Sequence, residues 1–260
     1  MPELPEVQTV TAALNYAIKN LVVKNIHLNR KDLRYKIPLE MKIYLPGAKV
    51  ISVNRRAKYG IIYFDNGYVI IFHLGMSGSI IIENNLLSNF NKHDHIVFDL
   101  IDASSTNNKI RFIYRDARRF GFFLFYKINS IKFKNYFNRF GEEPLSENFS
   151  IPLFYKLIKN KDTSIKSALL DQNIIAGLGN IYVCESLFYS GIRPTIKCKR
   201  LSYNRVKYLY EKIVEVLKRA IKEGGTSIQD HKNITGEIGY FQNYLSVYNR
   251  NGEECINKNC

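Results

Sequence analysis

The first six residues combine a latent amine nucleophile with carboxylic acids. They are Met1-Pro2-Glu3-Leu4-Pro5-Glu6, so removal of Met1 would leave a proline with a free secondary amine beside a carboxylate. An α-amino group has a pKa of roughly 7.7 to 8.0, so a useful fraction is unprotonated at neutral pH. A proline adduct at a sugar C1′ opens to a positively charged iminium, which acidifies the C2′ hydrogen and drives elimination. The competing interpretation is structural, with Pro5 starting a helix and Glu6 in its first turn.

The elements that must position this amine begin with a helix and continue with strands. Apolar residues recur at helical steps and define one face: Val7, Val10, Leu14, Ile18 and Leu21. Residues 59–64 and 68–72 flank Asp65-Asn66-Gly67, which predicts a β-hairpin whose Asn-Gly supplies the positive φ values. Further strands are predicted over 95–101, 110–114 and 120–126. We therefore predict an α+β chain in which residues 1–126 form an N-terminal two-sheet β-sandwich domain with the N-terminal helix at its flank.

The second half of the chain has helical spacing. Ser202 can cap a helix that Gly224-Gly225 ends, and its apolar stripe is Val206, Leu209, Ile213, Val216, Leu217, Ala220 and Ile221. A helical domain is thus predicted over 140–222, after a charged and aromatic linker at 127–139. In the last segment, 223–260, the residues from Tyr240 onward are expected to open a small hairpin.

A second helix start is predicted at Asn180, after Gly177 and Gly179. Asn180 can cap this helix, and the N–H groups of its first turn would then bind a phosphate. A plain tight turn explains the same glycines without any ligand. Cys184, on this predicted helix, is expected to be buried.

Charge indicates a polyanionic partner. The 260 residues include 38 Lys plus Arg against 23 Asp plus Glu, which gives a net charge of +15. AT-rich codon usage could account for part of the lysine content, but it explains the pairs Arg55-Arg56 and Arg118-Arg119 less well.

The composition also bears on the compartment. The N-terminus lacks the pattern of a signal peptide, and glycine and polar residues interrupt the most apolar run, Tyr68 to Ile82, so no membrane span is expected. Four cysteines in a chain expected to be intracellular do not indicate a disulfide framework, and a reducing cytoplasm is expected.

Six segments in order carry a family resemblance. The chain resembles the bacterial formamidopyrimidine-DNA glycosylases, base-excision repair enzymes for oxidised purines, through Pro2-Glu3-Leu4-Pro5-Glu6-Val7, Arg55-Arg56-Ala57-Lys58-Tyr59, His73-Leu74-Gly75-Met76-Ser77-Gly78, Lys92-His93-Asp94-His95, Asp116-Ala117-Arg118-Arg119-Phe120-Gly121 and Gly177-Leu178-Gly179-Asn180-Ile181-Tyr182. The resemblance implies a helix-two-turn-helix DNA-binding domain at 140–222. It also implies a monomeric cytoplasmic bacterial enzyme whose partner is double-stranded DNA with an oxidised purine or an abasic site.

The resemblance assigns catalytic roles. It implies that Pro2 attacks C1′ and expels the base as a Schiff-base nucleophile, that Glu3 assists sugar opening and proton transfer, and that Lys58 helps β-elimination. The implied enzyme is both a glycosylase and an abasic-site lyase that cuts by β,δ-elimination. The bland alternative for Lys58 is a solvated strand lysine.

The resemblance also assigns DNA contacts. Met76, Arg118 and Phe120 would fill the gap left by the extruded base, although Met76 alone could be a core residue. His93, Arg118, Lys161 and Asn180 would contact phosphates, although Lys161 could be a solvated loop lysine. Gly224, Gly225, Thr226 and Ser227 would form the loop that closes over the flipped base, a role compatible with a glycine helix end.

The family resemblance implies one structural Zn²⁺ on four cysteines and no organic cofactor. Only Cys255 and Cys260 match, because Cys184 and Cys198 fall in the helical domain. Either the sequence is truncated within the finger, which is the favoured interpretation, or the protein is a zincless variant. The missing half would carry a DNA-binding arginine, so weak binding and poor cleavage are expected until a downstream Cys-x-x-Cys segment is restored.

Two alternative functions stay open at this point. An endonuclease VIII-like glycosylase for oxidised pyrimidines is disfavoured by Leu4, where that sibling usually has glycine, and by the set of Met76, Arg118 and Phe120. A non-catalytic nucleic-acid binder is disfavoured by intact Pro2, Glu3 and Lys58.

Overall fold

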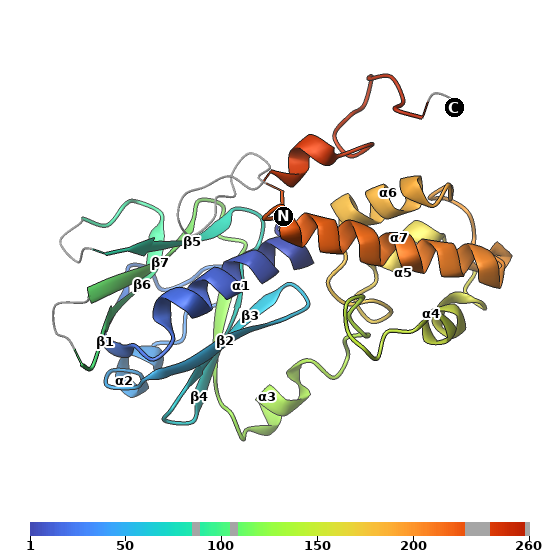
Figure 1. Ribbon diagram of the computed structural model, residues 1–260. Coiled ribbons are helices and arrows are strands. Elements are labelled where there is room, and N and C mark those ends of the chain that lie inside the picture. Colours follow the sequence, from blue (N-terminus) through green and yellow to red (C-terminus); the bar gives the residue numbers. More distant parts are fainter. Residues whose placement is uncertain (85–88, 105–108, 227–239, 258–260) are drawn as a thin grey trace. The chain divides into compact units, whose positions relative to one another are not determined.

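The protein is described by a computed structural model that covers residues 1–84, 89–104, 109–226 and 240–257 (Figure 1). The chain divides into two compact units. The first comprises Met1–Pro2, Glu6–Asn138 and Thr226, and the second comprises Glu3–Pro5, Arg139–Gly225 and residues 240–257. We describe each unit by itself. Ser227 and Cys260, both predicted site residues, lie outside the described residues.

The first unit contains two antiparallel four-stranded sheets. One has the order β1-β6-β7-β5, with β1 (Val22–Leu28), β6 (Asp94–Ile101), β7 (Lys109–Asp116) and β5 (Gly78–Glu83). The other has the order β2-β3-β4-β8, with β2 (Val50–Arg56), β3 (Tyr59–Phe64), β4 (Tyr68–His73) and β8 (Phe122–Lys127). Their inner faces share one apolar core, to which both sheets contribute phenylalanines such as Phe72 and Phe98. The predicted α+β class and N-terminal β-sandwich are confirmed.

Helix α1 (Leu4–Ile18) has the predicted apolar face. Val7, Val10, Leu14 and Ile18 are all buried in the core of the first unit. On the same helix, the Asn15 side chain accepts a hydrogen bond from the Val53 N–H of β2 at 2.8 Å. The apolar stripe and this polar anchor together fix the helix against the sheet that contains β2.

The predicted β3–β4 hairpin forms, but its turn differs from the prediction. Within Asp65-Asn66-Gly67, only Gly67 has a positive φ, +79°. The loop therefore has three residues with glycine in the left-handed position, rather than a two-residue Asn-Gly turn. The Asn66 amide instead donates to the Tyr44 carbonyl at 2.6 Å, at the end of α2 (Met41–Tyr44).

Residues 127–139, expected as a linker, contain helix α3 (Ile131–Tyr136). Its rings contact the second sheet, with Tyr136 6.3 Å from Tyr126 and Phe133 6.3 Å from Tyr63 between ring centroids. The boundary between the two units falls after Asn138.

The second unit is helical. It contains α4 (Ile151–Ile158), α5 (Ile165–Leu170), α6 (Asn180–Tyr189), the 3₁₀ helix η1 (Cys198–Arg200), α7 (Tyr203–Lys222) and the 3₁₀ helix η2 (Phe241–Tyr244). The long α7 (Figure 1) begins after Ser202, whose hydroxyl accepts the Arg205 N–H at 3.4 Å, and ends at Gly224 with φ +76°. Both predicted ends are confirmed, and the predicted stripe is buried apart from the half-buried Ile221.

The C-terminal segment differs from its prediction. The described residues 240–257 form η2 and turns and do not open the predicted hairpin. The segment is tied to α6 instead, because the buried Glu185 carboxylate accepts the N–H groups of Ser246, Val247 and Tyr248 at 2.8 to 3.0 Å. Among the described residues, no helix is long and apolar enough to cross a membrane.

Candidate active site

Glu3 is fixed at the start of α6. Its side chain is 2% exposed, and Oε1 accepts the Ile181 N–H at 2.9 Å. Gly179 leaves room for the carboxylate, since a Cβ there would lie 2.3 Å from Glu3 Cδ. The positive end of the α6 dipole favours a negative group at this position. The Glu3 carboxylate thus binds the helix start from a distant part of the sequence.

This arrangement corrects the prediction for Asn180. The N-cap residue is Gly179, which makes no side-chain cap, and Asn180 is the first residue of the helix with an exposed side chain. The Ile181 N–H that was expected to face a phosphate is bonded to Glu3. A phosphate contact at Asn180 would therefore use its exposed amide, and this role stays a prediction.

Pro2 is buried directly before Glu3, and Met1 is 50% exposed. The next residue, Leu4, is held by its N–H bond to the Gly177 carbonyl at 3.1 Å. Gly177 has φ +100°, and a Cβ there would lie 2.6 Å from Leu4 Cδ1. The glycines of the Gly-Leu-Gly-Asn segment therefore make close contact with residues 3 and 4, which explains why two glycines are needed.

Lys58 lies in the tight connection between β2 and β3. The preceding Ala57 is buried with φ +53°, a conformation that a non-glycine residue adopts at a cost. Arg55 supports the turn by donating to the Ala57 carbonyl at 2.9 Å and to Gln8 Oε1 at 2.8 Å. The Lys58 side chain is 8% exposed, so the interpretation as a solvated strand lysine is wrong.

His73 is a neutral imidazole in the surroundings of Lys58. Burial, together with the positive charges of Lys58 and Arg34, lowers its pKa to about 4. Nδ1 accepts the Gly75 N–H at 3.0 Å, which leaves the ring proton on Nε2. The sequence reasoning placed His73 in a motif but assigned it no role.

Met76 and Phe120 are exposed on two loops that meet at their backbones. Their exposed fractions are 41% and 45%, so the alternative that Met76 is a core residue is wrong. A Cβ on Gly75 would lie 2.4 Å from the Gly121 nitrogen, so the loops touch there. The Arg118 guanidinium lies 5.0 Å from the centre of the Phe120 ring.

Asp116 organises these two loops and was missed as a site residue. It is fully buried, and its carboxylate accepts Ser77 Oγ at 2.6 Å, the Gly121 N–H at 2.9 Å and the Tyr114 hydroxyl at 3.0 Å. The Arg118 N–H adds a bond of 3.2 Å. Burial and the Asp116 charge raise the pKa of Tyr114, which stays protonated as a donor. The acid just before Ala-Arg-Arg-Phe-Gly was the available signal.

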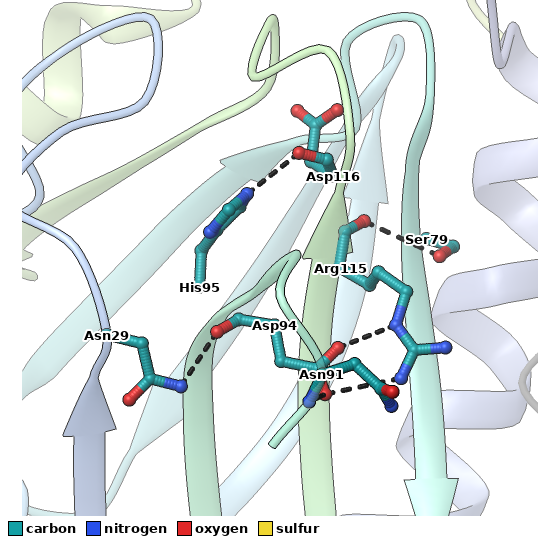
Figure 2. Close-up of polar contacts among 7 residues, drawn as sticks. All are labelled: Asn29, Ser79, Asn91, Asp94, His95, Arg115 and Asp116. Atoms are coloured by element: carbon teal, nitrogen blue, oxygen red, sulfur yellow. Dashed lines mark hydrogen bonds and ion pairs between the residues drawn. The ribbon is translucent and has the colours of Figure 1, made fainter.

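Figure 2 shows the polar contacts that tie Asp116 and Asp94 to their neighbours. His95 Nε2 donates to the Asp116 carbonyl at 2.8 Å, and the Asp94 carboxylate accepts Arg115 Nε at 2.6 Å and the Asn91 N–H at 2.8 Å. The half-buried His93 lies between these anchors, and its carbonyl accepts the Asp116 N–H at 3.1 Å.

The start of the predicted lesion loop is bound to Glu6. Gly224 and Gly225 have φ values of +76° and +79° and end α7. Thr226 is 4% exposed and donates twice to Glu6 Oε1, from its N–H at 2.8 Å and from Oγ1 at 2.9 Å. Glu6, expected only in the first turn of a helix, therefore holds Thr226 in the first unit.

Lys161 and the cysteines lie in other surroundings. Lys161 is half-buried between α4 and α5, and its carbonyl accepts the Lys199 N–H at 3.1 Å. Cys184 is half-buried rather than buried, and its Sγ accepts a hydrogen bond from Lys166 Nζ at 3.4 Å.

The described residues do not fit a four-ligand zinc site. Cys198 is buried, Cys255 is exposed, and no group of three or more His, Cys, Asp or Glu residues in the described ranges could hold a metal ion.

The chain matches two family domains that together cover most of its length. Residues 1–123 match the formamidopyrimidine-DNA glycosylase N-terminal domain, and residues 140–232 match the formamidopyrimidine-DNA glycosylase H2TH domain. The relative named formamidopyrimidine-DNA glycosylase from Roseobacter denitrificans is 39% identical over 267 residues, covering 100% of this chain and 92% of its own length. The one from Zymomonas mobilis is 40% identical, covering 98% and 91%.

Solved structures of similar fold indicate the same family as the sequence relatives. The Lactococcus lactis Fpg bound to abasic-site DNA has a TM-score of 0.87 at 32% identity, covering 98% of this chain and 91% of that one. The complex of wild-type Lactococcus lactis Fpg with N7-benzyl-Fapy-dG DNA has a TM-score of 0.88 at 32% identity, covering 99% and 91%. The chain belongs to the formamidopyrimidine-DNA glycosylase family.

Proposed function

We propose that this protein excises oxidised purines from double-stranded DNA through the Pro2 amine and then cleaves the abasic site. Family membership supports a base-excision repair glycosylase with lyase activity. The observation that carries the residue assignment is Glu3, whose buried carboxylate is held on the α6 start immediately beside Pro2.

The reaction begins once Met1 has been removed. The unprotonated Pro2 nitrogen attacks C1′, the C1′–N bond to the base breaks, and the base leaves with a proton. The secondary amine loses its N–H proton to the departing base, and Glu3 donates a proton to the ring oxygen as the sugar opens to the positively charged iminium. The iminium then acidifies C2′, and loss of that hydrogen expels the 3′ phosphate, followed by the 5′ phosphate.

Lys58 and His73 suit the phosphate side of this reaction. Lys58 is a cation held in a rigid turn, and His73 is a neutral donor whose proton is on Nε2. A neutral imidazole can donate a hydrogen bond without adding a charge that would disfavour the developing iminium. Removal of the Lys58 charge should slow β-elimination more than base excision.

Base extrusion is assigned to the two loops fixed by Asp116. Unstacking a base step costs a few kcal/mol, and an apolar wedge compensates part of this cost. Exposed Met76 and Phe120 can supply the wedge, and Arg118 can hydrogen-bond the orphaned base. Leu4, which packs on Gly177, is consistent with the purine rather than the pyrimidine enzyme.

The remaining assignments complete the proposal. The protein acts as a monomer in the bacterial cytoplasm, with DNA as its partner.

Borohydride trapping tests the function directly. Protein whose mass shows loss of Met1 is incubated with an 8-oxoguanine duplex, an oxidised-pyrimidine duplex and an undamaged duplex, each with borohydride. We expect a covalent adduct chiefly on the first, lost in Pro2→Gly and strongly reduced in Glu3→Gln. Absence of an adduct with protein that binds the duplex would leave only a nucleic-acid binder.

A further inference from the structure

A strongly basic pocket lies in the second unit, and its lining contains none of the residues assigned above. It has a volume of about 490 Å³ and lies in the segment between α6 and the first turn of α7. Its charged lining consists of four cations, Arg193, Lys197, Arg200 and Arg205. No carboxylate is among the lining residues, all of which belong to the described part of the chain.

The pocket wall is held by the backbone and by buried anchors. Ile192, Cys198 and Leu201 are 4%, 0% and 3% exposed, while the four cations between and around them are exposed. The Cys198 N–H bonds to the Thr163 carbonyl at 3.0 Å, and the Ile165 N–H bonds to the Ile196 carbonyl at 2.8 Å. The cations are therefore presented from a fixed scaffold.

The arginines of the lining gather positive charge that no carboxylate of the lining balances. Arg205 lies in the first turn of α7, at the positive end of the helix dipole, where no acidic residue is present. Its guanidinium donates to the Gly191 carbonyl at 3.3 Å, which brings it to the pocket wall. Like charges gathered at such a position oppose stability, and violations of this kind are expected at binding sites.

One carboxylate beside the pocket already binds one of its cations. Asp162 accepts Lys197 Nζ at 2.8 Å and also Lys199 Nζ at 2.6 Å, although Lys199 is not part of the lining. Lys199 in turn donates its backbone N–H to the Lys161 carbonyl at 3.1 Å, so a predicted phosphate contact lies next to this lysine pair. An oxyanion held by two ammonium groups resembles a backbone phosphate between lysines.

We infer that this pocket binds backbone phosphates of duplex DNA outside the damaged nucleotide. The inference rests on the proposed function only in taking DNA as the polyanion. Arginine forks bind phosphate in a bidentate manner, and such contacts carry no sequence information. The pocket therefore strengthens binding to damaged and undamaged duplex alike.

The test measures duplex affinity against salt for the double variant Arg193→Gln/Arg200→Gln. Each lost phosphate contact makes the slope of log association constant against log salt concentration less steep by about 0.9. Loss of two contacts should therefore weaken binding about 60-fold at 0.1 M salt. We expect this loss on both lesion and undamaged duplexes, with their affinity ratio unchanged. The matched control, Lys132→Gln/Lys134→Gln on α3, removes the same charge from exposed positions and should have a much smaller effect. Equal losses of duplex affinity in the two double variants would overturn the inference that the pocket binds DNA.

A second variant and a second ligand complete the test. Asp162→Asn releases Lys197 and Lys199 from their competing carboxylate, and we expect several-fold tighter binding to undamaged duplex. Calorimetry with inorganic phosphate distinguishes a free anion from DNA. The DNA assignment would be overturned by a double variant Arg193→Gln/Arg200→Gln that no longer binds inorganic phosphate but keeps the wild-type affinity for duplex DNA. Affinity for undamaged duplex tests the pocket independently of the proposed function, because it requires no base excision.

Discussion

Gly179→Ala should disable Glu3 without altering any reacting group. The backbone at Gly179 has φ −135° and ψ −166°, which alanine adopts without strain. The added Cβ would lie 2.3 Å from Glu3 Cδ and 2.4 Å from Oε1, so the carboxylate must leave the α6 start. Its bond to the Ile181 N–H is lost with it.

The magnitude follows from the contacts that are lost. A hydrogen bond to a charged group is worth about 1.5–3 kcal/mol. Alanine at an N-cap costs roughly 1 kcal/mol relative to glycine. Alanine also lowers the conformational entropy of the unfolded chain relative to glycine, which stabilises the folded protein by about 0.4–1 kcal/mol. We therefore expect the free energy of unfolding of the wild-type background to fall by roughly 2 kcal/mol.

A double-mutant cycle isolates the clash. In Glu3→Ala protein the carboxylate is absent, so Gly179→Ala should change the unfolding free energy by less than about 0.5 kcal/mol. The two assays are urea denaturation and the rate of borohydride-trapped adduct formation, which should fall about 100-fold, as expected for loss of a positioned acid–base group. Equal costs of Gly179→Ala in both backgrounds, or an unchanged adduct rate, would refute the reasoning.

Three further perturbations test the supporting contacts. Asp116→Asn places an amide against several donors, so the free energy of unfolding should fall by about 1–3 kcal/mol in urea denaturation, and an unchanged value would contradict its organising role. The folded-state pKa of His73 is about 4, below the ordinary 6.5, so the unfolded chain binds the extra proton between these pH values. Stability should consequently decline as the pH falls from 6.5 to 4, by at most about 3 kcal/mol, and His73→Gln should lose that part of the slope in denaturation series. Glu185→Gln removes a charged acceptor from three N–H groups, so hydrogen exchange at residues 246–248 should accelerate about tenfold, and unaltered protection would disprove this anchoring.

The elements that the sequence predicted correctly depend on local patterns. Helix α7 has a repeating apolar stripe, a serine cap and glycines at its end, and all three act within a few residues of one another. The β3–β4 hairpin is similar, because two runs of apolar residues flank a short turn. The sandwich followed from the number and spacing of such runs.

The errors occur where partners are distant in sequence. Asn180 is the better cap by residue type, but the carboxylate at that helix start comes from Glu3, 178 positions from the Ile181 N–H that it accepts. Glu6 likewise looked like an ordinary helix residue because its partner Thr226 is 220 positions away. Asp116 collects donors from two loops, and no spacing rule connects a buried acid to loops that meet only after folding.

The most direct test of the central claim is to locate the trapped sugar on the protein. The borohydride adduct is digested with nuclease and protease and mapped by mass spectrometry. The account predicts that the reduced sugar remnant is attached to the peptide that begins with Pro2, on its amino nitrogen. A remnant attached to Lys58 or to any other lysine would contradict it.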